Sequence, residues 1–75
     1  MPVLQRFPAS RVVLYAGDHL LPHIHIQLDD GRECTVDIDT LKIKGRISQR
    51  EIVGELEWIA SRQTFLLGEW KRYNP

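Results

Sequence analysis

Apolar and polar residues alternate along the first half of the chain, as they do in β-strands that bury one face. The stretches that read as strands lie at about residues 3–7, 11–15, 23–28 and 33–39. Because short strands joined by turns pair with their neighbours in sequence, the pattern predicts an antiparallel sheet of three or four strands. Residues 41–45 are read either as a further short edge strand or as a loop.

The two central strands fix their own register, because their apolar residues must share one face. These residues are Ile24, Ile26 and Leu28 on one strand and Cys34, Val36 and Ile38 on the other. A two-residue turn at 30–31 would place the two sets on opposite faces, whereas a three-residue turn at 29–31 keeps them together. The longer turn pairs Ile26 with Cys34.

The last third of the chain changes to a helical period. Apolar residues recur at spacings of four and three, with Gln63 in phase: Ile52, Leu56, Ile59, Leu66, Trp70 and Tyr73. Val53, Ala60 and Leu67 widen this stripe on one side. Ser48 and Glu51 have the spacing of a capping box, which begins a helix near residue 49. The pattern predicts one helix over 49–73, with a kink near Gln63–Thr64 as the alternative.

Residues 1–75 are therefore expected to form a single α+β domain, in which a small antiparallel sheet packs on one long C-terminal amphipathic helix. A chain of 75 residues has a thin core, and its stability is expected to be roughly 3–5 kcal/mol. Proteins of this size often gain stability by associating with another chain.

The net charge argues against some classes of function, and the cysteine content indicates a cellular compartment. Ten basic and ten acidic residues give no net charge, which argues against a general nucleic-acid or membrane-surface binder. The basic stretch 42–50 leaves nucleic-acid contact as a weak alternative. No signal peptide or membrane-spanning run is visible. Cys34, the single cysteine, is expected to be a small buried hydrophobe, and the protein is expected in the cytoplasm.

All three histidines, His19, His23 and His25, lie within seven residues, next to Asp18. A His-x-His pair on a strand projects both rings to one face, about 7 Å apart. The hairpin register places His23 across from Asp37, and the next register of the same parity places His25 there. One interpretation is a divalent-metal site with His23 and His25 as ligands, in a metal-assisted hydrolase or nuclease. The other is ordinary cross-strand hydrogen bonding, with no cofactor.

A second set of residues lies on the predicted helix outside its apolar stripe. It comprises two aromatic residues and, beside them, three small residues at a spacing of seven: Trp58, Phe65, Gly54, Ser61 and Gly68. A glycine inside a helix costs about 1 kcal/mol relative to alanine, so this line of small residues indicates a groove where another backbone approaches. It predicts a binding face for a partner helix or a second copy. Alternatively, the sheet or the N-terminal segment covers both aromatic rings.

The motifs together resemble a bacterial family of short proteins, DUF4160. The resemblance rests on the start at Met1–Phe7, on Asp18-His19, on the Pro-His-x-His segment at 22–25, and on the helix end at 66–73. It implies an α+β fold and carries Asp18, His19, His23 and His25 over as signature residues. It also implies a toxin–antitoxin-like or regulatory gene pair, without an established activity. Leu21 replaces a second proline of many relatives, so the loop before the motif is less rigid.

Two functional hypotheses follow. The first is a small cytoplasmic interaction module that forms a homodimer or pairs with a small protein. The second is a metal-assisted hydrolase or nuclease that uses the cluster of Asp18, His19, His23, His25 and Asp37.

Overall fold

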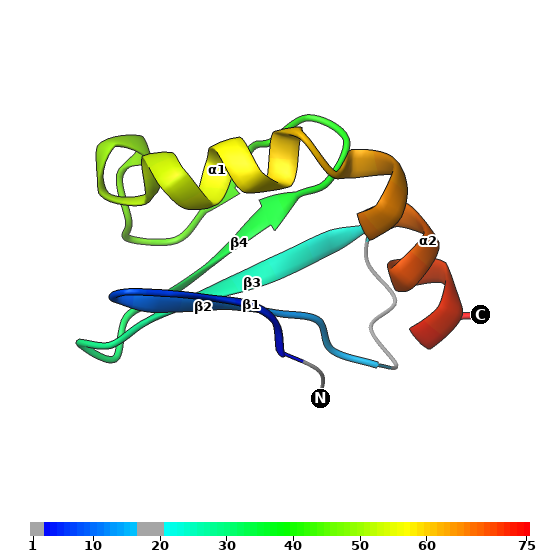
Figure 1. Ribbon diagram of the computed structural model, residues 1–75, viewed down its shortest axis with the longest axis horizontal. Coiled ribbons are helices and arrows are strands. Elements are labelled where there is room, and N and C mark those ends of the chain that lie inside the picture. Colours follow the sequence, from blue (N-terminus) through cyan, green and yellow to red (C-terminus); the bar gives the residue numbers. More distant parts are fainter. Residues whose placement is uncertain (1–2, 17–20) are drawn as a thin grey trace.

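The computed structural model describes residues 3–16 and 21–75 as a sheet covered on one face by helices (Figure 1). Its elements are β1 (Val3–Phe7), β2 (Ser10–Val13), β3 (His23–Leu28), β4 (Glu33–Asp37), β5 (Ile43–Lys44), the 3-10 helix η1 (Gln49–Ile52), α1 (Val53–Ala60) and α2 (Gln63–Tyr73). The strands are antiparallel and stand in the order β1-β2-β3-β4-β5. The α+β prediction is confirmed. The described residues form five strands, because Ile43–Lys44 adds an edge strand to β4.

The register predicted for the central hairpin is confirmed. Ile26 pairs with Cys34, and the same register places His25 across from Thr35 and His23 across from Asp37. The turn between the strands spans residues 29–31, and Gly31 within it has a φ of 96°, a left-handed conformation that glycine adopts without steric cost.

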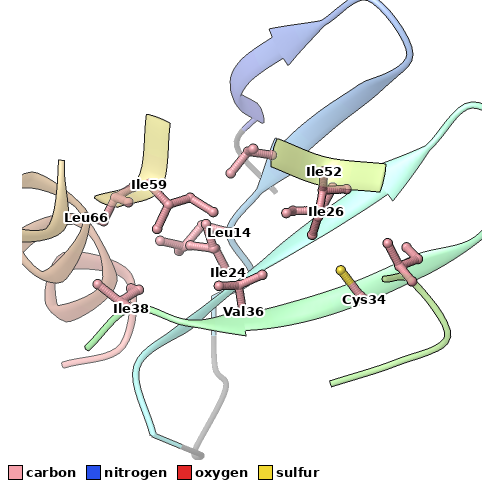
Figure 2. Packing of buried hydrophobic residues seen from close by; sticks show 11 residues of the cluster. Leu14, Ile24, Ile26, Cys34, Val36, Ile38, Ile52, Ile59 and Leu66 are labelled. Atoms are coloured by element: carbon pink, nitrogen blue, oxygen red, sulfur yellow. The ribbon is translucent and has the colours of Figure 1, made fainter. Parts of the chain in front are cut away.

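The core lies between the sheet and the helices, and Figure 2 shows its side chains meeting there. The strands contribute Ile24, Ile26, Cys34 and Val36, the residues just after β2 and β4 contribute Leu14 and Ile38, and the helical segments contribute Ile52, Ile59 and Leu66. Full burial of one such aliphatic side chain is worth about 1.5–3 kcal/mol. In so small a core, each of these side chains therefore carries a large share of the net stability.

The prediction of one helix over 49–73 is corrected by the structure. The capping box of Ser48 and Glu51 is present and begins η1, but the helical path breaks between α1 and α2. Ser61 Oγ donates to the carbonyl oxygen of Trp58 (2.9 Å), and Arg62 has φ −132° and ψ 26°. The expected alternative, a kink near Gln63, lies close to the actual break.

Tertiary contacts explain where α2 goes after this break. Gln63 Nε2 donates to the carbonyl oxygen of Ile38 (2.7 Å), just after β4. This bond explains why a polar residue stands in the apolar stripe of the helical segment. Asn74 Nδ2 donates to the carbonyl oxygen of Tyr15 (3.3 Å). Helix α1 lies over the sheet, while α2 turns and passes the end at which β3 begins (Figure 1). No helix among the described residues is long and apolar enough to span a membrane.

An ionic link joins the tip of the central hairpin to the start of the helical segment. Arg32 Nη2 lies 2.9 Å from Asp30 and 2.7 Å from Glu51. The hydrogen bond from Arg32, followed by that from the Ser48 backbone N–H, holds the pKa of the Glu51 carboxyl below its usual value. Glu51 therefore both caps η1 and ties it to the hairpin.

Cys34 is the buried small side chain that its alternating position predicts. Only 2% of its surface is exposed, and burial raises the pKa of its thiol to about 11. Because the thiolate is the reactive form, the folded chain presents no activated thiol at neutral pH at this position.

Candidate functional site

The sheet face opposite the helices gathers the histidines with polar partners from four strands. We call it the histidine face. By strand alternation and cross-strand pairing, it carries Arg11, Val13, Tyr15, His23, His25, Gln27, Glu33, Thr35, Asp37 and Lys44. The imidazoles therefore lie on the side predicted from the alternation of isoleucine and histidine.

His25 is held in place by a hydrogen-bonded chain across the sheet. Its Nδ1–H donates to Glu33 Oε2 (2.8 Å). Gln27 Nε2 donates both to Glu33 Oε1 (3.0 Å) and to the hydroxyl oxygen of Tyr15 (2.8 Å), and Arg11 Nε donates to Gln27 Oε1 (2.6 Å). The Tyr15 ring meets the His25 ring edge to face at 4.3 Å. The bond to Glu33 and the contact with the Tyr15 ring hold the imidazole in one orientation.

His23 lies beside His25 and is more deeply buried. Its ring centroid is 5.2 Å from that of His25, and only 6% of its surface is exposed. The Nδ1–H donates to the carbonyl oxygen of Leu21 (2.6 Å), which fixes the entry of the chain into β3. Val13, which pairs with His25, is fully buried on this same face. The histidine face therefore has a small buried cluster of its own.

A small pocket opens next to His23. Its volume is about 180 Å³, and Leu21, His23, Thr35, Asp37 and Lys44 line it. Asp37 lies across from His23 and Lys44 across from Thr35. The pocket therefore offers an imidazole, a carboxylate, a hydroxyl and an ammonium group to a small polar ligand.

The predicted histidine and aspartate cluster is assembled in part. His23, His25 and Asp37 share the histidine face, whereas Asp18 and His19 lie outside the described residues. The carboxylate that contacts His25 is that of Glu33. Within residues 3–16 and 21–75, no three histidine, cysteine, aspartate or glutamate side chains form a group able to hold a metal ion.

The residues of the predicted partner-binding face are divided between the two helices. Gly54 and Trp58 belong to α1, Ser61 stands at the break, and Phe65 and Gly68 belong to α2. The Trp58 ring packs edge to face on Phe7 of β1, with 6.3 Å between ring centroids. The N-terminal strand therefore packs on the Trp58 ring, as the alternative interpretation expected for this residue. Phe65 is 53% exposed.

A different surface of α1 is hollowed and partly apolar. Gln49, Val53, Leu56, Glu57 and Ala60 line a depression of about 260 Å³, which we call the α1 depression. The last four of these residues stand at positions i, i+3, i+4 and i+7. Four residues at this spacing form the hole that accepts one side chain of a facing helix. Val53 is 49% exposed at this site.

The sequence comparison identifies the family. The family model described as a domain of unknown function, DUF4160, matches residues 10–71. The chain belongs to the DUF4160 family. No curated protein and no solved structure matches it significantly. The DUF4160 match extends from the start of β2 into α2, so it includes both the histidine face and the α1 depression.

Two parts of this DUF4160 site were missed by the sequence reasoning. Glu33 was not predicted beside His25, because it lies across from Gln27 and reaches His25 diagonally. Diagonal neighbours on antiparallel strands are within reach of long side chains. Val53 and Ala60 were taken as the edge of the core stripe. Glu57, which stands beside them in the helical phase on the side away from Ile59, is the signal that could have assigned them to the surface.

Proposed function

We propose that this DUF4160 chain is a protein-interaction module that docks a helix of another chain on the α1 depression. The observation that carries the proposal is the half-exposed valine, Val53, in a hole of the shape that receives a side chain from a facing helix. Docking would remove Val53, Leu56 and Ala60 from water, and burial of apolar surface is the main favourable term in association.

The separation of core residues from surface residues along the helices supports this proposal. The core of the chain already takes Ile52 and Ile59 from a different side of the helical segment. Single exposed apolar residues are common, but here Val53 and Ala60 adjoin the partly buried Leu56 on one helix side. In our proposal the module acts in the cytoplasm, where its buried thiol stays reduced, as one component of a toxin–antitoxin-like or regulatory pair.

Photo-crosslinking at position 53 tests the docking surface. With benzoylphenylalanine in place of Val53, we expect a covalent adduct with a protein chain in the organism's own cells, identified by mass spectrometry. The same probe at Gly68, an exposed α2 position with open space around it, is the control. Adducts from position 68 but none from position 53 would move the docking site to α2, and no adduct from either would refute the proposal.

The approach of His23 to His25 favours a second candidate function, a metal-assisted hydrolase or nuclease. Each Nδ1–H is donated to an oxygen, so in the neutral rings Nε2 carries the lone pair, as in histidines whose other nitrogen is oriented by a hydrogen bond for metal binding. Asp37 borders the same pocket. Because residues 3–16 and 21–75 offer no group of three such ligands, a zinc or manganese ion bound by these residues would need a further ligand. Such an ion would lower the pKa of a bound water and so supply a nucleophile at neutral pH.

Metal titration observed through the histidine NMR resonances separates this function from a structural role. Under the metal hypothesis, one equivalent of zinc or manganese selectively shifts or broadens the resonances of His23 and His25. A His25→Gln variant should lose the response while keeping its far-ultraviolet circular dichroism. Unchanged resonances at stoichiometric metal would leave the histidines as hydrogen-bonding residues of the sheet.

A further inference from the structure

We infer that the pocket beside His23 binds a small zwitterion, and that an α-amino acid is the class of molecule it takes. The pocket belongs to the histidine face, on the side of the sheet away from the helices. The site is therefore separate from the α1 depression and goes beyond the proposed function. Three neighbouring strands line it with polar side chains: His23 of β3, Thr35 and Asp37 of β4, and Lys44 of β5.

The polar residues of the pocket form two rows across the sheet. His23 stands across from Asp37 in the first row, and Thr35 stands across from Lys44 in the second. Thr35 and Asp37 are two positions apart on β4, so the rows are about 7 Å apart along the strands. One row therefore presents a carboxylate, and the other presents a hydroxyl and an ammonium group. A short molecule with two oppositely charged ends can bridge them.

The two charged residues of the pocket do not pair with each other. Within the described part of the chain, no ion pair or side-chain hydrogen bond includes Asp37 or Lys44. Elsewhere in the chain neighbouring charges do pair, as Arg32 does with Asp30. The ammonium group of an amino acid can donate to Asp37, and its carboxylate can accept from Lys44 and Thr35. Such a ligand gains charge-assisted hydrogen bonds at both ends.

The charges of the pocket favour a zwitterion over a simple anion or cation. A ligand that carries only a carboxylate would bring it near Asp37, and a ligand that carries only an amine would bring it near Lys44. Like charges at such short separations repel each other. A molecule with both groups meets an opposite charge in each row, and its net charge is zero.

The size and the walls of the pocket indicate a small amino acid. The volume of about 180 Å³ corresponds to roughly six water molecules in the liquid, which is the size of alanine. His23 forms a wall that is only 6% exposed, and its bond to the carbonyl oxygen of Leu21 holds the ring in place. The Leu21 side chain also lines the pocket and is 73% exposed, so a small apolar group of the ligand can cover part of it.

Titration with L-alanine, followed through the backbone amide NMR resonances, tests the site. In metal-free buffer, L-alanine should shift the resonances of Thr35, Asp37 and Lys44 until they saturate. We expect a dissociation constant on the order of 1 mM, which is within the range open to a ligand of this size. Propionate lacks the ammonium group and ethylamine lacks the carboxylate, so neither should shift these resonances at the same concentration.

Two variants each remove one charge of the pocket. Asp37→Asn and Lys44→Gln should each raise the dissociation constant for L-alanine by about tenfold or more, because each loses a hydrogen bond between charged groups. Asp39→Asn and Lys71→Gln are the matched controls, since they remove the same charges at exposed positions outside the pocket. Both controls should bind as the wild type does, and circular dichroism confirms that each variant is folded.

Three results would overturn this inference: no shift with L-alanine, equal shifts with propionate or ethylamine, or unchanged affinity in both pocket variants. A response to zinc without a response to L-alanine would also overturn it, and would leave the pocket to the metal-assisted candidate function. Crosslinking at position 53 concerns a different surface, so failure of the amino-acid site and failure of the proposed function are separate outcomes.

Discussion

Replacing Ile59 with alanine is expected to leave a large fraction of the chain unfolded at room temperature. Ile59 is fully buried and projects from α1 into the core (Figure 2). Truncation of a buried isoleucine costs about 2–5 kcal/mol, and the whole domain is expected to have only roughly 3–5 kcal/mol. Because alanine favours helix, the loss reports the core contact. Urea unfolding followed by tryptophan fluorescence and circular dichroism measures it.

Val53→Ala is the matched control for this experiment, because it lies on the same helix but is half exposed. Its effect on the free energy of unfolding should stay within about 0.5 kcal/mol. Both variants should be compared at concentrations low enough to dissociate any dimer, so that loss of association does not add to the result. Equal losses from both variants would contradict the assignment of one residue to the core and the other to the surface.

The second large effect is expected at Gly45, just after β5. Its φ is 136°, and a Cβ placed there would lie 3.0 Å from Cys34 Cβ, 3.1 Å from Cys34 Cα and 3.2 Å from the carbonyl oxygen of Glu33. Two of these three atoms belong to the backbone around β4 and cannot rotate away. Gly45→Ala should therefore lose more than the about 1–3 kcal/mol of backbone strain alone, with a matching fall in melting temperature.

Gly31→Ala isolates the contact from the strain. Gly31 also has a positive φ, 96°, but no atom lies within 4 Å of the position that its Cβ would take. This variant should lose only the strain, about 1–2 kcal/mol. If Gly45→Ala proves no more destabilising than Gly31→Ala, the close approach of Gly45 to β4 is wrong.

The sequence pattern was sufficient to predict the sheet but not the path of the helices. Ile24, Ile26, Cys34 and Val36 share one face in only one parity of register, so the hairpin could be predicted before any coordinates. The spacing of Ile59 and Leu66 fits a straight helix as well as a broken one. The hydrogen bond from Gln63 to the Ile38 carbonyl oxygen selects the broken path. This bond depends on how β4 ends, and the periodicity of the helical residues contains no information about the end of a strand.

The candidate sites were predictable to a similar extent. Alternation located His23 and His25 on one face with Thr35 and Asp37 opposite them, and the structure has these pairings. It could not identify Glu33 as the carboxylate bound to His25, because a diagonal contact depends on side-chain rotamers. Nor could the helical phase alone assign Val53, because the width of the buried stripe depends on how much of the helix the sheet covers.

The strand order has a consequence for how the chain reaches this fold. Each strand of the sheet pairs with the one that precedes it in sequence, so every hairpin can close over a short segment before the next one adds to it. Closing short loops costs less conformational entropy than closing long ones, and folds rich in such local pairings cross their folding barrier quickly. The sheet can therefore assemble strand by strand, leaving the docking of α1 and α2 as the step that excludes water from the core.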